Sequence, residues 1–245
     1  MLCWRSGTYL WQGRWQEALG AADAARLIAQ RVHSLYVYAM ASSLAAYAAW
    51  RMGGDENAHM ALKESTGWLS SADRWLFVSL NQGWLAEIAA ERAARRAVEP
   101  GLPSADSDLT AAWPTVRHHT ALALRRARQG DQLGSAMAGR AMAWSMALQH
   151  TLPPAARGAG WPVRHVTNHA TNHAVTHYLA LADRTAAARG SPHELANNHW
   201  CRARIAGLQG HAASARDWAE QAAVGFERLQ MDWHLAHIRP LLQNR

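Results

Sequence analysis

The alanine content constrains the fold of this chain more than any other feature. Of its 245 residues 52 are Ala, whereas Val and Ile together contribute only 13. Alanine is the strongest helix former and β-branched residues favour sheets, so the composition predicts an all-α protein. Because many apolar side chains are this small, the core must form by close approach of helix backbones. A hydrophobic content of 49% excludes disordered and collagen-like chains.

Glycine and alanine recur at a fixed spacing where one helical pattern gives way to the next. Glycine adopts the positive φ of a tight turn, and a small alanine five residues later lets the second helix start against the first. This pattern predicts antiparallel helical hairpins. It occurs at Gly13 and Ala18, Gly53 and Ala58, and Gly210 and Ala215.

A second kind of turn leads from one hairpin to the next and is marked by Ser, Asp and Pro, which suit the start of a helix. These turns are predicted near residues 33–34, 71–73, 130–131, 190–192 and 230–232. The spacings of 39, 59, 60 and 40 residues between positions 33, 72, 131, 191 and 231 correspond to two hairpins of about 40 residues and two enlarged ones. We therefore expect a right-handed α-solenoid of antiparallel hairpins.

Apolar residues recur with helical periodicity around the first and last of these turns. Each such stripe predicts a helix face that a neighbouring helix covers. The stripes comprise Trp15, Ala18, Leu19, Ala22, Ala25 and Ala29; Ala196, Trp200, Ala203 and Gly207; and Ala215, Trp218, Ala219, Ala222, Phe226 and Leu229.

Two segments rich in proline enlarge the central units. Residues 100–114 and 151–162 are predicted to be loops or broken helices. Because hairpin patterns resume after each, we expect one domain over residues 1–245, with irregular insertions near 99–115 and 151–177.

The glycine turn followed by two alanines seven residues apart occurs as Gly13/Ala18/Ala25 and again as Gly210/Ala215/Ala222. This pattern resembles the tetratricopeptide repeat. Residues 178–243 resemble the closing repeats of bacterial signal-transduction ATPases, class III nucleotide cyclases and maltose-regulator-like activators. The resemblance implies a non-catalytic protein-interaction or regulatory scaffold, possibly the solenoid part of a larger bacterial signalling system.

The first predicted helix begins with apolar and aromatic residues and lacks a polar cap, which the end repeats of solenoids need. We therefore expect this end, with Trp4, Tyr9 and Trp11, to bind an upstream domain, a second copy of the chain or another protein.

Arginine supplies nearly all of the positive charge, since the net charge is +7 and Lys63 is the only lysine. Clusters lie at Arg92, Arg95 and Arg96, and at Arg125, Arg126 and Arg128. An Arg-rich solenoid that contacts nucleic acid is one alternative function. Solvated helix faces explain the clusters more simply. We expect a protein or peptide partner and not nucleic acid, with Arg92, Arg95, Arg96, Arg125 and Arg126 as candidate partner-binding residues.

Four histidines recur at intervals of four residues, as His165, His169, His173 and His177. Residues at i and i+4 lie one helical turn apart, a separation at which two imidazoles bind Zn²⁺, Ni²⁺ or Cu²⁺. A transition-metal-binding protein is therefore a second alternative. A short tandem expansion on an exposed segment would give the same spacing.

Motifs for catalysis are absent from the sequence, which contains no nucleophile elbow, no HExxH and no phosphate-binding glycine loop before Lys63. Cys201 is expected to be an inert buried thiol. Most of the 13 tryptophans are expected in the core, and Trp113 and Trp161 in the proline-rich segments are expected to be exposed. We therefore expect no enzyme activity and no cofactor.

Residues 32–50 contain no Asp, Glu, Lys or Arg over 19 positions, enough to span a bilayer. Polar and small residues dilute their apolarity, so we interpret the segment as a buried helix. No secretory signal precedes it, and we expect a cytoplasmic protein without a membrane segment.

Overall fold

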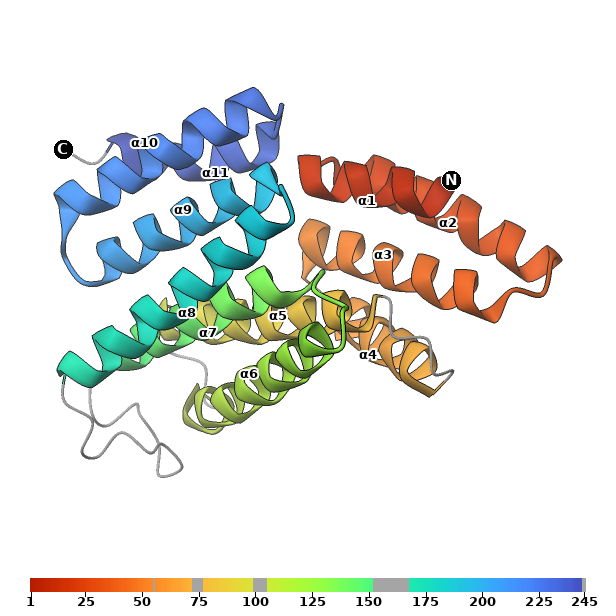
Figure 1. The fold of residues 1–245 in the computed structure, drawn as a ribbon, viewed down its shortest axis with the longest axis horizontal. Helices are drawn as coiled ribbons and strands as arrows, with labels where there is room; N and C mark the ends of the chain where they lie inside the picture. Colours follow the sequence, from red (N-terminus) through yellow and green to blue (C-terminus); the bar gives the residue numbers. More distant parts are fainter. Residues whose placement is uncertain (55, 72–76, 99–104, 152–167, 244–245) are drawn as a thin grey trace.

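The computed structural model describes residues 1–54, 56–71, 77–98, 105–151 and 168–243, and within these it leaves undescribed the side chains of 96–98, 105–111, 150–151 and 168–170. The described residues form helices and contain no strand, which confirms the all-α prediction (Figure 1). The helices are α1 (Leu2–Gln12), α2 (Trp15–Arg31), α3 (Leu35–Gly53), α4 (Glu56–Ser71), α5 (Val78–Val98), α6 (Ala105–Arg128), α7 (Ser135–Thr151), α8 (Asn168–Ala188), α9 (Pro192–Leu208), α10 (Ala212–Arg228) and α11 (Asp232–Gln243). In this described part, no helix is both long and apolar enough to cross a membrane.

Each helix packs against the next one along the chain, so the helices form a series of antiparallel pairs (Figure 1). Contacts between helices two apart join the odd-numbered ones: α1 with α3, α5 with α7, α7 with α9, and α9 with α11. The odd-numbered helices therefore share one side of the molecule, and the even-numbered helices cover them.

The predicted tight turns lie where the sequence placed them. Gly13, Gly54 and Gly210 end or follow a helix with φ of 75°, 68° and 76°, in the left-handed region that glycine tolerates. At two of the return turns the left-handed residue is not glycine, because His33 and Gln230 have φ of 53° and 56°. A residue with a side chain is strained in this left-handed conformation, whereas glycine adopts it without strain at the other turns.

Most residues of the predicted apolar stripes are buried or half-buried, although much of the core lies outside these stripes, on α3, α5 and α7. On α2 the stripe from Trp15 to Ala29 is buried except for Leu19, which is half-buried. On α9 the prediction is wrong at Gly207, which is exposed, and the helix buries Glu194 and Asn198 instead. These buried polar residues indicate that one face of α9 packs against polar groups and not against an apolar core.

The first proline-rich segment is more regular than expected. Residues 105–114 were predicted to be a loop or a broken helix but belong to α6, which continues through Pro114. Trp113 is buried and not exposed, since only 6% of it is accessible. Residues 99–104 and 152–167, with Trp161, lie outside the described residues, and residues 168–177 belong to α8.

A buried polar contact fixes the start of α7 against the start of α5. The Asp131 carboxylate accepts hydrogen bonds from the Ser79 backbone N–H at 2.8 Å and from the Ser79 hydroxyl at 2.7 Å. The Ser79 Oγ in turn accepts one from the Gly134 N–H at 3.0 Å. A Cβ on Gly134 would lie 1.7 Å from the Ser79 carbonyl oxygen, so this close approach requires glycine.

Candidate functional site

A central cavity lies between the N-terminal and C-terminal helices. Water-sized molecules can occupy about 80 Å³ of it, so the cavity is small and most of its interior is filled by the side chains that line it. With the exception of Trp15 at the first position of α2, every residue that lines it comes from an odd-numbered helix. The lining residues are Leu10, Trp11, Trp15, Tyr47, Arg51, Trp84, Glu87, Ala90, Glu91, Met137, Arg140, Ala141, Trp144, His193, Glu194, Asn197, Trp200, Cys201, Arg204 and His234.

Helices α3 and α5 meet at this cavity through aromatic and charged side chains. Tyr47 stacks on Trp84 with ring centroids 4.4 Å apart, and its hydroxyl donates a 2.8 Å hydrogen bond to Glu87. Arg51 forms an ion pair with Glu91 at 2.5 Å. These two pairs place a guanidinium and two carboxylates on the same wall.

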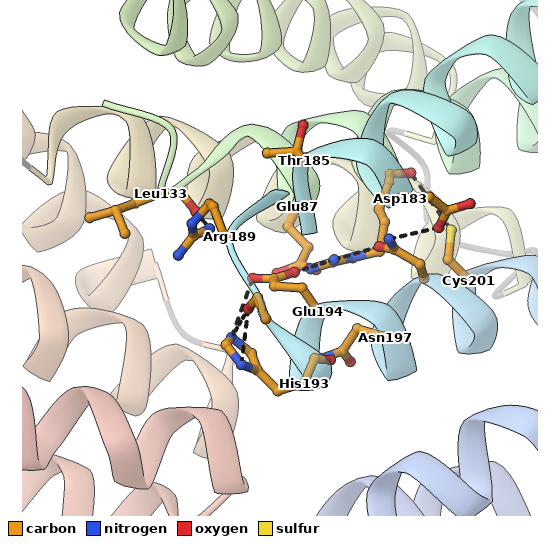
Figure 2. A network of polar contacts seen from close by, with 12 residues as sticks. Glu87, Leu133, Asp183, Thr185, Arg189, His193, Glu194, Asn197 and Cys201 are labelled. Carbon is orange, nitrogen blue, oxygen red and sulfur yellow. Dashed lines mark hydrogen bonds and ion pairs between the residues drawn. The ribbon is translucent and has the colours of Figure 1, made fainter. Parts of the chain in front are cut away.

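A second ion pair joins α7 to α9. Arg140 donates to Glu194 and, at 2.9 Å, to Asn198, and its guanidinium lies 3.7 Å from Glu87 (Figure 2). Through Asn198, which donates to Asp183 at 2.9 Å, the network extends to α8. Arg140 and Glu194 are 6% and 1% exposed, so the pair is shielded from water.

The buried acids of the cavity differ in pKa because their neighbours differ. Burial raises the pKa of Glu87, although Arg140 nearby opposes the shift. Burial would also raise the pKa of Glu194, but Arg140 and the hydrogen bond from His193 outweigh it and lower the pKa to about 2. For Glu91, burial is likewise outweighed, mainly by Arg51 and then Arg204, and its pKa is lowered. Glu91 and Glu194 are therefore anions at neutral pH.

Three arginines line the cavity, and Arg204 is the one that forms no ion pair with a described acid. Its guanidinium lies 3.9 Å from the centroid of the Trp144 ring and 5.7 Å from that of Trp200. It donates no hydrogen bond to any described residue. Four buried nitrogens in the lining have no described hydrogen-bond partner, namely Trp15 Nε1, Trp144 Nε1, Arg51 Nε and His234 Nδ1. The two indole nitrogens and the guanidinium nitrogen are donors, and because buried donors normally have partners, the cavity suits a ligand that presents acceptors.

The N-terminal hairpin meets the C-terminal helices at the edge of the cavity. Trp11 of α1 stacks on His193 of α9 with ring centroids 4.8 Å apart. Trp15 meets Trp233 of α11 edge-on at 5.2 Å, and Arg51 lies 4.7 Å from the Trp233 ring centroid. The turn of the first hairpin thus packs against α9 and α11 at the cavity, whereas the two termini lie well apart (Figure 1).

Of the aromatic residues predicted to form a partner-binding N-terminal end, only Trp11 lines the central cavity. Trp4 is 53% exposed and its ring lies 5.9 Å from that of Phe77. Tyr9 is half-buried beneath Arg14, whose guanidinium is 4.4 Å from the ring centroid. Trp4 and Trp11 line one small pocket together with Phe77, and Tyr9 does not line it.

The first predicted arginine cluster is divided in the structure. Arg92 forms an ion pair with Glu56 at 2.9 Å, and Arg95 is exposed 5.8 Å from the Trp50 ring centroid. The side chain of Arg96 lies outside the described residues. In the second cluster Arg125 is exposed and Arg126 is half-buried.

The predicted histidine metal site is only partly described. His165 and the side chain of His169 lie outside the described residues, whereas His173 and His177 are exposed on α8. Within the described part of the chain, no group of three or more His, Cys, Asp or Glu is placed to hold a metal ion.

The two cysteines are free and buried. Burial raises the pKa of the Cys201 thiol to about 11, so the thiol stays protonated at neutral pH although Cys201 lines the cavity. A protonated thiol is a weak nucleophile, and the ion pairs occupy the neighbouring acids. This arrangement is suited to binding a ligand.

The sequence alone did not identify the charged residues of the cavity as candidate site residues. The available signal was a charge inside an otherwise apolar helix, such as Arg140 among the Ala and Met residues of α7, because such residues are buried only when paired. Their partners lie 40 residues away in the chain for Arg51 and Glu91, and 54 residues away for Arg140 and Glu194.

No protein-family model matches the chain, and a comparison with curated proteins found no match. The geometry of the cavity is therefore the basis for the function proposed below.

Proposed function

We propose that this chain is a non-catalytic interaction module, an α-solenoid of tetratricopeptide-like hairpins that binds a protein partner in its central cavity. The observation that carries the proposal is that odd-numbered helices line the cavity and even-numbered helices cover them. In a helical-repeat solenoid, one helix of each hairpin forms the inner, concave surface in this way.

The spacing of the inner helices supports a repeat. Helices α3, α5, α7, α9 and α11 begin at residues 35, 78, 135, 192 and 232, and the outer two intervals, of 43 and 40 residues, are close to the expected 40. In an open solenoid each hairpin contacts only its neighbours, so the Trp11–His193 and Trp15–Trp233 contacts mean that the proposed right-handed superhelix over residues 1–245 is closed between its first hairpin and α9 and α11.

The size and chemistry of the cavity favour one or two side chains, or the terminal carboxylate, of a protein partner as the occupant, since only about 80 Å³ of it is open to a water-sized molecule. Aromatic walls bind apolar side chains, and the unpartnered donors suit backbone carbonyls or carboxylates. The charged pairs hold the walls in place and leave Arg204 as the one arginine that is free to bond to an incoming acceptor among the described cavity residues.

Site-specific photo-crosslinking tests the proposal. A photo-reactive amino acid is placed at Asn197, which lines the cavity, and in a separate protein at Glu220, which is exposed on α10. Both proteins are expressed in the source cells and irradiated, and the crosslinked proteins are identified by mass spectrometry.

We expect a discrete partner that crosslinks through position 197 and not through position 220. The same set of proteins at both positions, or none at position 197, would contradict a partner-binding cavity.

A further inference from the structure

A second concave surface lies on the other side of α7 from the central cavity, between α6 and α8. We call it the α6–α8 groove. It is lined by Trp113, Pro114, Arg117, His118, Thr120, Ala121, Leu124, Arg125, Arg128, Met142 and Tyr178. None of these residues lines the central cavity, so the two surfaces are separate.

Among the described residues, no acid is paired with an arginine of the groove. Arg117, Arg125 and Arg128 are exposed, and none forms an ion pair with a described residue. The Arg117 guanidinium lies 5.9 Å from the centroid of the Trp113 ring. Three guanidiniums in one groove with no carboxylate in its lining create a local excess of positive charge.

The surrounding sequence does not neutralise this excess. Residues 109–182 contain seven arginines but one acid, Asp131, so 74 residues carry a formal charge of +6 out of the +7 of the whole chain. Both oxygens of Asp131 accept hydrogen bonds from Ser79, and Asp131 is buried. Most of the formal positive charge therefore lies in one third of the sequence, and of its seven arginines Arg140 is paired with Glu194 in the central cavity.

Apolar side chains form the floor between these arginines. Met142 is buried and Leu124 is half-buried, whereas Ala121 is exposed. Arg117 and Arg128 are eleven residues apart, so their Cα atoms lie about 16 Å apart along the axis of α6 and face nearly the same direction. A ligand along α6 could therefore meet positive charge at both ends and apolar surface between them.

We propose that the α6–α8 groove binds an acidic peptide segment that carries apolar side chains. Its carboxylates would bond to Arg117, Arg125 and Arg128, and its apolar side chains would cover Leu124 and Ala121. Guanidinium groups bind carboxylates in bidentate geometry, and the apolar floor adds a hydrophobic contribution.

The groove suits a peptide better than a nucleic acid. Single-stranded nucleic acids use exposed aromatic rings on which bases stack. Here Trp113 is buried and Tyr178 is half-buried, and the accessible floor is aliphatic. This proposal does not depend on the central cavity, so either proposal can fail while the other stands.

Binding is measured by fluorescence anisotropy of a labelled amphipathic peptide of Glu, Leu and Ala, about four helical turns long. Three further probes serve as comparisons: the same peptide with Gln in place of Glu, a poly-Glu peptide, and a single-stranded RNA of equal charge. The protein variants are R117Q/R125Q/R128Q and a control, R31Q/R228Q/R239Q, which removes three exposed arginines from α2, α10 and α11. Circular dichroism verifies that both variants are folded.

We expect the Glu/Leu peptide to bind more tightly than the other probes, and the groove variant to weaken its binding about tenfold, the sum of three exposed charge pairs. The control variant changes the net charge equally, so it should weaken binding by less than about threefold. Absence of binding, an equal loss in both variants, or tighter binding of the RNA would each overturn the proposal.

Discussion

The central cavity and the α6–α8 groove each contain three arginines, and the two sets have opposite surroundings. In the cavity Arg51 and Arg140 are paired with buried carboxylates, and Arg204 lies against tryptophan rings. In the groove Arg117, Arg125 and Arg128 are exposed and no described carboxylate pairs with them. The comparison shows that a residue type alone does not define a role: the buried arginines hold helices together, whereas the exposed ones remain available to a ligand.

The largest expected effect is that of Arg140→Met. Methionine replaces most of the volume but leaves Glu194 buried without its cation, and removal of one partner of a buried pair costs about 3–5 kcal/mol of unfolding free energy. Urea denaturation at neutral pH measures this loss. Arg125→Gln in the groove is the matched control and should change the unfolding free energy by less than about 0.5 kcal/mol. Equal losses in the two variants would remove the distinction between the regions.

Acid should destabilise the cavity edge through His234. Burial, and then the nearby charge of Arg51, lowers the pKa of His234 to about 3 from 6.5. The unfolded chain therefore binds this proton at a higher pH than the folded chain does. The stability that neutral His234 contributes is complete above pH 6.5 and falls as the pH is lowered toward 3.

Between pH 7 and pH 5 this one group should cost about 2 kcal/mol. His234→Phe removes the titrating group. Between pH 7 and pH 5 the unfolding free energy of this variant should therefore fall by about 2 kcal/mol less than that of the unmodified protein. Urea denaturation of both proteins at the two pH values gives the difference. Identical pH dependence in the two proteins would show that His234 is not buried as a neutral group.

Arg204 is intermediate between the two regions, because it lies in the cavity without a bonded acid. Arg204→Gln removes its contact with the Trp144 ring, and a cation–π contact of this kind contributes about 1 kcal/mol. Thermal or urea denaturation measures the effect, with Arg184→Gln on the exposed side of α8 as the control. A loss of unfolding free energy as large as that of Arg140→Met would show that Arg204, like Arg140, is paired with a buried acid.

The smallest effect on stability is expected for the groove variant R117Q/R125Q/R128Q. Its arginines have no paired carboxylate among the described residues, so their removal should change the unfolding free energy by less than about 0.5 kcal/mol per site. Destabilisation well beyond this in urea would show that the groove arginines support the fold.

The sequence predicted those parts of the fold that depend on neighbouring residues. The turns at Gly13, Gly54 and Gly210 and the alanine stripe of α2 follow from backbone conformation and helical periodicity, both of which are local. The stripe of α9 was wrong at Gly207 because this helix also faces the cavity and buries Glu194 and Asn198.

Pairing over long distances in the chain could not be predicted. Trp113 appeared exposed because prolines surround it, but α6 passes through Pro114 and the ring lies in the core. The contact of Trp11 with His193 joins residues near the two ends of the chain, and no periodicity in the sequence indicates it. Which arginines are paired was likewise visible only once the helices were placed.

The first hairpin packs against α9 and α11 and closes the cavity between the inner helices, and crosslinking tests this contact most directly. Trp11→Cys and His193→Cys, in a background with Cys3 and Cys201 replaced by Ser, place two thiols where the stacked rings now lie 4.8 Å apart. A short bis-maleimide should join them within one chain, as seen by mass spectrometry. The control pair Trp11→Cys and Glu220→Cys should not be joined. Absence of the Trp11–His193 crosslink in the folded protein, or equal crosslinking of both pairs, would contradict a closed cavity.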